Sequence, residues 1–343
     1  MANKRPLTVP PNRSTRPTVQ WITTRGAANL ASMLKNRLIF GAIMIAALVG
    51  LIVFDDHLAQ SLAEDVTPNL LINLHYYLRD GGIVLGILSV LIVLAARELH
   101  RLFHAAHAAS LLWIPTAVCL MLLAITFLTR HGLMPNVSGD ITDDYRASMT
   151  IFVMGFGAVC LGVMARRRTE GATAAIAASM LMIVYLGLLP QFLLRVRMWA
   201  PSGAAWLLLY AIIVVKVCDI GAFFTGRSLG KHKLIEWLSP KKTIEGLMGG
   251  IAASTLTAIG LAAAFKHWGP FRIQAAFPTM GVAAAYGALA AVIGQTGDLV
   301  ESLFKRDAAA KDSANAIPAF GGVLDVLDSL LLTAPLAYWM LIE

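Results

Sequence analysis

Long apolar runs recur along most of this chain and constrain its fold more than any other feature. Several approach or exceed the roughly 18 residues that a helix needs to cross a bilayer. They are continuous rather than alternating, which excludes a membrane β-barrel. Hydrophobic residues make up 57% of the 343 positions and charged residues only 14%, against about 25% charged in soluble domains. We therefore expect an all-α, polytopic integral membrane protein.

Nine of these runs are candidate transmembrane helices, with bounds good to a few residues. They cover residues 38–54, 82–96, 108–128, 148–165, 174–194, 203–226, 246–265, 277–294 and 322–342. The second run is short, and Arg97 and Glu98 could extend it. No internal repeat stands out, so the sequence does not indicate an inverted-repeat transporter.

Residues 1–36 precede the first run and are polar, with Pro and Arg but without an acidic residue. This composition predicts a disordered tail, whose basic charge suits the anionic head groups of a membrane. Beyond the tail we divide the chain into N-terminal transmembrane helices, 37–200, and a C-terminal catalytic region, 201–343. The division follows the segments described below, which all lie in the second part.

The distribution of Lys and Arg orients the chain in the membrane. With the N-terminus in the cytoplasm, 20 of the 28 basic residues fall on the cytoplasmic side and 7 on the other side, and Lys216 lies within a span. Cytoplasmic loops carry such an excess of basic residues. Loops 227–245 and 295–321 then both face the cytoplasm, where nucleotides are found. We expect a multi-pass protein of the inner, cytoplasmic membrane.

Two other classes of function are disfavoured by composition. The three cysteines, Cys119, Cys160 and Cys218, lie inside apolar runs and form no CxxC pair, so neither a disulfide framework nor a zinc site is indicated. The net charge of +8 is explained by the topology, and no nucleic-acid module is present.

The segment from Ser302 to Asp328 carries the most unusual chemistry. Four acidic residues, three basic residues and a Gly-Gly pair crowd into it, although charge at a membrane is costly. Carboxylates, basic side chains and glycines together are what metal-assisted phosphate chemistry requires.

Acidic residues in and before this segment fall at helical spacing. Asp298, Glu301 or Ser302, and Lys305 would share one face of a helix. The alternative is an ordinary solvated helix with an internal ion pair. Asp325 and Asp328 would likewise share one face at the mouth of the last span, and a role as Mg²⁺ ligands is favoured over ion pairs with nearby lysines.

Gly321 and Gly322 precede that last span. Glycine permits close approach of the backbone to a ligand, and the following helix start would present free N–H groups to an anion. The alternative is a plain turn into the span, which is the better reading for two glycines considered alone.

Two upstream groups have both a structural and a functional interpretation. Asp219 could pair with Lys216 one turn earlier, or it could face the same cavity as Asp298 and Asp325. Lys241 and Lys242 could be topology anchors, which spacing alone favours, or they could bind phosphate.

Taken together, these residues closely resemble the signature of phosphatidate cytidylyltransferases, the CDP-diacylglycerol synthases. The match is strong over residues 210–343 and weak before about residue 200. Its spacing is kept at Ser302, Lys305-Arg306, Lys311-Asp312, Ala314, Pro318, Gly321-Gly322, Asp325 and Asp328. Asp219, the run from Ser239 to Gly246, Gly297-Asp298 and Glu301 resemble the upstream blocks of the family. Two positions depart from it: Phe320 stands where the family usually has His, and Val326 where it usually has Arg.

The resemblance implies transfer of a cytidylyl group from CTP to phosphatidate, with the membrane as the site of reaction. It implies catalytic roles for Asp298, Lys305, Arg306, Lys311, Asp325 and Asp328. Metal ligation, by Mg²⁺ with a second cation left open, would fall to Asp219, Asp298, Asp325 and Asp328. Substrate binding would fall to Lys241, Lys242, Ser302, Asp312, Gly321 and Gly322.

Several questions stay open at this level. The alternatives are a CTP-dependent enzyme acting on an isoprenoid alcohol or ether lipid, and a cation-coupled transporter. No nucleic-acid partner is expected, and a homodimer is left open. The sequence assigns no role to the first five spans.

Overall fold

The structure, a computed structural model, describes residues 49–50, 54, 57, 81–131, 133, 141–199, 203–268, 278–310 and 321–342. Within these residues eight helices are long and apolar enough to cross a membrane. Each overlaps one of the predicted spans after the first, which confirms the all-α, polytopic membrane fold. The predicted tail and almost all of the first predicted span, 38–54, lie outside the described residues.

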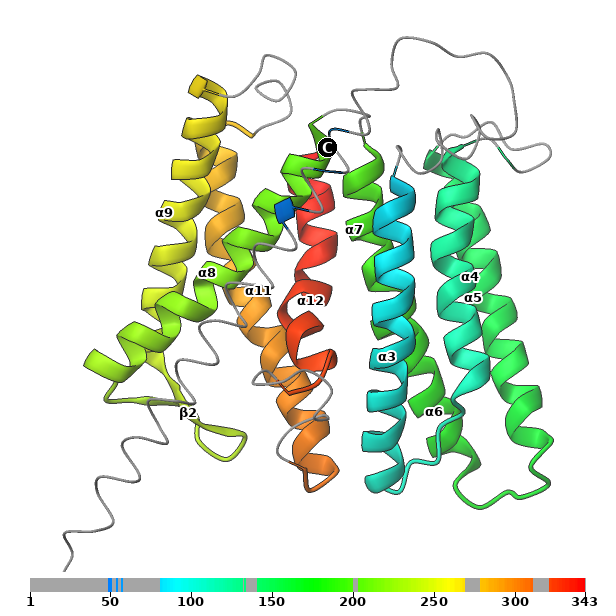
Figure 1. Ribbon diagram of the computed structural model, residues 1–343. Helices are drawn as coiled ribbons and strands as arrows, with labels where there is room; N and C mark the ends of the chain where they lie inside the picture. Colours follow the sequence, from blue (N-terminus) through cyan, green and yellow to red (C-terminus); the bar gives the residue numbers. More distant parts are fainter. Residues whose placement is uncertain are drawn as a thin grey trace, which may run out of the picture.

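The elements follow one another in the order predicted by the apolar runs (Figure 1). The N-terminal helices are α3 (Ile83–Ala105), α4 (Trp113–Arg130), α5 (Ile141–Met164), α6 (Ala172–Ile183), the π-helical segment η3 (Val184–Leu188) and α7 (Leu189–Met198). The C-terminal elements are α8 (Ala204–Leu229), β1 (Lys233–Ile235), β2 (Ser239–Thr243), α9 (Ile244–Trp268), α11 (Met280–Asp307) and α12 (Leu324–Leu341). Helices α6 and α7 and the segment between them form one continuous apolar span.

The helices form two groups that lie side by side in Figure 1. Helices α8, α9, α11 and α12 form one group, and α3 to α7 form the other. Helix α12 packs against α11 in its own group and against α7 in the other. A single apolar core extends through both groups, so the N-terminal helices support the C-terminal ones directly.

Small residues allow close packing in the C-terminal group. A Cβ atom on Gly249 would overlap Thr225, and a Cβ atom on Gly221 would meet Ala253. Glycines at such crossings let the backbones of membrane helices approach each other. They allow the second half of α8 to pack closely against the first half of α9.

A short hairpin joins α8 to α9. Strands β1 and β2 pair antiparallel, with Lys233 opposite Thr243. The Glu245 carboxylate, in the first turn of α9, accepts hydrogen bonds from the backbone N–H groups of Lys231 and His232 at 3.1 and 3.2 Å. This contact fixes the loop that leaves α8 against the start of α9. It positions Lys241 and Lys242, which lie on β2.

The chemistry-bearing segments gather at one end of the molecule (Figure 1). The C-terminal ends of α3, α8 and α11 lie there, together with the hairpin and the first turn of α12. Loops predicted to share the cytoplasmic side thus lie at the same end of the bundle. The sites predicted on these loops can therefore form a single centre.

Candidate active site

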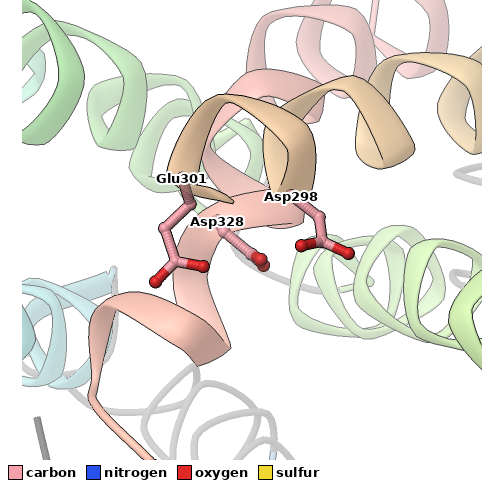
Figure 2. Close-up of side chains that lie close together, drawn as sticks. All are labelled: Asp298, Glu301 and Asp328. Atoms are coloured by element: carbon pink, nitrogen blue, oxygen red, sulfur yellow. The ribbon is translucent and has the colours of Figure 1, made fainter. Parts of the chain in front are cut away.

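Three carboxylates meet where α11 passes α12. Asp298 and Glu301 project from α11 and Asp328 from α12, and Figure 2 shows the three side chains directed to one region. One carboxylate oxygen from each lies within 4.8 Å of the others. Spacing of three residues places the first two on one face of a helix. We call these three residues the acidic cluster.

Gly297 makes this meeting of helices possible. A Cβ atom at Gly297 would overlap the carbonyl oxygen of Asp328, so the two backbones approach more closely than any other residue would allow. Asp298 follows that glycine directly, and its carboxylate is therefore brought near Asp328. The Gly-Asp pair in the sequence thus has a geometric explanation.

The acidic cluster is largely closed to solvent. Glu301 is 1% exposed and Asp328 is 6% exposed, whereas Asp298 is partly exposed. Buried like charges repel, and the repulsion is relieved by cations nearby or by protonation. The arrangement therefore calls for positive charge from side chains, from a metal ion or from both.

Two lysines supply part of this charge. Lys242 Nζ lies 2.7 Å from Asp298 Oδ2. Lys305 Nζ lies 2.7 Å from Glu301 Oε2 and 2.7 Å from Asp325 Oδ1. The first lysine comes from the hairpin and the second from the last turns of α11. The predicted face with Asp298, Glu301 and Lys305 therefore forms.

Asp325 is placed differently from its predicted role as a metal ligand. One of its oxygens receives Lys305, and the other accepts the N–H of Gly322 at 2.6 Å. Asp325 is not among the three grouped carboxylates. In this structure the ion-pair alternative describes Asp325, while Asp328 faces the other two acids.

The predicted free N–H groups at the start of α12 are not free, which corrects that expectation. The N–H groups of Val323 and Leu324 each donate to one oxygen of Glu98 at 2.9 Å. The N–H of Gly322 is taken by Asp325. Carboxylates therefore occupy the positive end of the helix dipole, where the sequence suggested a phosphate. Gly321 has φ +99°, a conformation that favours glycine.

Glu98 was not assigned a role from the sequence. It lies on α3, is 3% exposed, and reaches a helix more than two hundred residues later in the chain. A carboxylate within an apolar run is costly enough to indicate a specific partner, and that signal was present in the sequence. Its partner could not be found there, because the pairing depends on how α3 packs beside α12.

Asp219 faces the same region as Asp298. Gln295 Nε2 donates to Asp219 Oδ1 at 2.9 Å. Lys216 Nζ lies 3.9 Å from Asp219 Oδ2, but it makes shorter hydrogen bonds, of 2.9 Å each, to Val326 O and Ser329 Oγ on α12. Asp219 therefore forms the predicted ion pair with Lys216 and also faces the region of Asp298. The ion pair is the longer of its contacts.

A cavity of about 360 Å³ opens beside these groups. Its walls come from α8, the hairpin, the start of α9 and α11. The polar and charged lining residues include Asp219, Arg227, Lys241, Lys242, Thr243, Gln295 and Asp298. A cavity with lysines on one wall and carboxylates on another suits a phosphate group bound with a divalent cation.

The remaining predicted site residues are only partly placed. Arg306 is exposed, and its Nε donates to the carbonyl of Leu238 at 3.3 Å, which ties α11 to the hairpin. Ser302 is half-buried on α11 beside Glu301. Lys311 and Asp312 lie outside the described residues.

Comparison with known proteins agrees with this geometry. The family model described as "Cytidylyltransferase family" matches residues 70–342. A phosphatidate cytidylyltransferase of Synechocystis is 30% identical over 281 residues, which cover 74% of this chain and 87% of the relative. One of Staphylococcus aureus is 30% identical over 267 residues, covering 78% and 93%. One of Bacillus subtilis is 38% identical over 159 residues, covering 46% and 55%. With a match that spans most of its length, this chain belongs to the cytidylyltransferase family.

Proposed function

We propose that this protein transfers the cytidylyl group of CTP to phosphatidate, giving CDP-diacylglycerol and pyrophosphate. The observation that carries the proposal is the acidic cluster beside the lysine-lined cavity, in a chain whose relatives bear the name of that activity. The same name applies to relatives covered over 87% and 93% of their length. The family match favours this enzyme over a cation-coupled transporter.

The reaction requires little acid–base chemistry from the protein. A phosphate oxygen of phosphatidate attacks the α-phosphorus of CTP, a new P–O bond forms, and the bond to pyrophosphate breaks. The attacking oxygen is already ionised near neutral pH. Catalysis therefore depends on positioning and on neutralising charge.

The donor set fits Mg²⁺. Asp298, Glu301 and Asp328 offer hard oxygen ligands within 4.8 Å of one another, and Mg²⁺ prefers carboxylate and phosphate oxygens. Bound there, the ion would supply Lewis-acid activation of a phosphate oxygen. Asp219 lines the same cavity as Asp298 and would help to hold a cation bound on that side. This set replaces the predicted Asp325 with Glu301.

The lysines would bind and orient phosphate. Lys242 lies in the cavity beside Asp298 and on the side open to a nucleotide. Lys241 is exposed beside it. Lys305 is committed to Glu301 and Asp325, so we assign it to holding those carboxylates in position. By bridging Glu301 and Asp325, Lys305 offsets part of the repulsion between these two carboxylates.

We place the site on the cytoplasmic face of the inner membrane. This placement rests on the excess of basic residues in the loops at that end of the bundle. CTP would then reach the cavity from the cytoplasm. Phosphatidate would arrive from the bilayer, since its acyl chains remain in the membrane while its head group meets the cavity.

Pyrophosphate release by the detergent-purified protein tests the proposal. CTP, phosphatidate and Mg²⁺ are omitted in turn, and release is expected only when all three are present. Release from folded protein with an isoprenoid alcohol or an ether lipid, but not with phosphatidate, would replace the proposed acceptor. Ion flux into liposomes without CTP, in the absence of any release, would overturn the assignment as an enzyme.

A further inference from the structure

A π-helical segment interrupts the span from Ala172 to Met198. It covers Val184–Leu188, and π-helical turns inside α-helices are rare and often mark functional sites. Pro190 follows at the start of α7, where its missing N–H removes one regular helical hydrogen bond. The wider turn shifts the side chains on either side of it relative to a regular helix. No motif in this part of the sequence indicates a role.

Tyr185 lies on this segment and is directed to the C-terminal group of helices. It is 3% exposed, and its ring meets that of Phe304 edge-on, with 5.9 Å between ring centroids. Phe304 lies on α11, one turn after Glu301. The contact therefore places Tyr185 beside the turn of α11 that follows Glu301, a member of the acidic cluster.

The Tyr185 hydroxyl has no hydrogen-bond partner among the described residues. Glu301 Oε1 is likewise buried without one, while Glu301 Oε2 receives Lys305. Buried polar groups are nearly always hydrogen-bonded, so each exception needs an explanation. A donor and an acceptor left unsatisfied near the same acidic cluster are explained by two bound groups, an anionic oxygen that accepts from the hydroxyl and a cation that the carboxylate ligates.

We propose that Tyr185 contacts substrate in this site, its hydroxyl donating a hydrogen bond to a phosphate oxygen held at the acidic cluster. The inference rests on the proposed function. A phenol hydroxyl suits this role because it donates a proton to an anion without adding a positive charge that would compete with the cation. The phosphate belongs either to CTP or to phosphatidate.

This contact gives the N-terminal helices a direct part in the reaction. Helix α11 carries Asp298 and Glu301, and Tyr185 of the segment η3 meets the same helix at Phe304. A phosphate bound between them would be fixed by both groups. The π-helical turn would then be kept because it presents Tyr185 at the required position.

The variant Tyr185→Phe removes only the hydroxyl and tests the proposal. We expect kcat/KM for CDP-diacylglycerol formation to fall by about 10-fold or more, as for loss of a hydrogen bond to a charged group. The thermal midpoint in detergent is expected to stay the same or rise, because the hydroxyl lacks a partner in the protein. A hydroxyl with a purely structural role would instead lower the midpoint and leave kcat/KM unchanged.

Tyr286→Phe is the matched control. Tyr286 is fully buried, and its hydroxyl donates to the carbonyl of Ala211 at 3.4 Å. It precedes Asp298 on α11 by about 18 Å of helix, taking roughly 1.5 Å per residue. We expect a lower thermal midpoint and near-normal kcat/KM for this variant, the reverse of the result for Tyr185→Phe.

Equilibrium binding of CTP with Ca²⁺ and without phosphatidate identifies the source of the phosphate. Weaker CTP binding by Tyr185→Phe would assign the contact to CTP. Unchanged CTP binding with a raised KM for phosphatidate would assign it to the lipid. The proposal would be overturned if kcat, both KM values and the affinity for CTP were all unchanged. Binding can be measured even if the wild-type protein proves inactive on phosphatidate, so failure of the proposed function remains a separate result.

Discussion

Two groups of buried charges in this protein differ in whether their positive and negative charges balance. The first lies in the N-terminal helices, where Arg195 Nε meets Asp144 Oδ2 at 2.7 Å. Arg195 also donates to Gln191 at 3.0 Å and lies over the ring of Tyr145, 4.6 Å from its centroid. One positive charge faces one negative charge, and both have hydrogen-bond partners. Such a pair needs nothing from outside the protein.

The second group surrounds the acidic cluster and is not balanced. Among the described residues, five carboxylates, on Asp219, Asp298, Glu301, Asp325 and Asp328, have three lysines as ion-pair partners, Lys216, Lys242 and Lys305. Within this set the formal excess is two negative charges, which equals the charge of one divalent cation, while Arg227 and Lys241 line the adjoining cavity. In this fold, a buried group whose positive and negative charges balance is a structural contact. A buried group with an excess of one sign is a candidate binding site.

The largest effect is expected from Asp328→Asn. Loss of one carboxylate from the acidic cluster should lower kcat for CDP-diacylglycerol formation by about 1,000-fold, or about 4 kcal/mol in the barrier. Stability in detergent should be maintained or increased, because a repelling charge is removed. The measurements are turnover and thermal unfolding of the purified variant.

Asp307→Asn is the control for that change. Asp307 is an exposed carboxylate at the end of α11, so the same substitution should leave turnover near the wild-type value. Near-normal turnover in Asp328→Asn would show that Asp328 has no role in the reaction. The distinction between the two charge groups would then be wrong.

The opposite pattern is expected from Arg195→Met. Removal of the cation leaves Asp144 buried without its partner, which should destabilise the protein by about 3 kcal/mol. Turnover per folded molecule should change little, since this group lies among α5 and α7 rather than at the acidic cluster. The double variant with Asp144→Asn should recover part of the lost stability. A large loss of turnover in folded Arg195→Met would show that this pair also serves the reaction.

Mg²⁺ should stabilise the folded protein by binding at the acidic cluster and not at the Arg195–Asp144 pair. At about one hundred times its Kd, a ligand that binds only the folded state stabilises it by about 2.7 kcal/mol. We expect a corresponding rise in the thermal midpoint of the wild-type protein and of Arg195→Met. The rise should be lost in Asp328→Asn. An equal rise in all three proteins would mean that Mg²⁺ binds elsewhere.

The transmembrane spans and the acidic residues of the site show how far the sequence predicts this structure. The spans were predictable because bilayer thickness fixes the length of an apolar run, and helical spacing correctly placed Asp298, Glu301 and Lys305 on one face. Spacing also placed Asp325 and Asp328 on one face. It could not show that Asp325 contacts Lys305 and Gly322 while Asp328 joins Asp298 and Glu301, because neighbours on other helices decide this.

Contributions from distant helices were the hardest to predict. Glu98 and Tyr185 come from α3 and from the π-helical segment, far along the chain from the signature, and no local pattern connects them to it. The short hairpin that presents Lys242 was also not expected, since its strands lie in a charged loop. Each of these depends on tertiary packing, which local sequence periodicity does not report.

The smallest effect is expected from Glu98→Gln, which probes how the N-terminal helices hold the site. Both oxygens of Glu98 accept N–H groups at the start of α12. The amide of Gln keeps one oxygen that can accept an N–H. Its NH2 group is a donor and cannot accept the other N–H. We expect turnover to fall by about 10-fold, roughly 1.4 kcal/mol, because the first turn of α12 carries Asp325 and leads to Asp328.

Glu170→Gln makes the same chemical change at an exposed position and should leave turnover unaltered. If Glu98 acts through the position of α12, the Glu98→Gln variant should also bind Mg²⁺ more weakly, seen as a smaller rise in thermal midpoint than in the wild-type protein. A lower midpoint with unchanged Mg²⁺ affinity and turnover would instead place Glu98 with Arg195 and Asp144, among the charges that only stabilise the fold. Glu98 is therefore the residue at which the distinction between the two charge groups is most sharply tested, because it is a buried carboxylate of the N-terminal helices whose partners belong to the site.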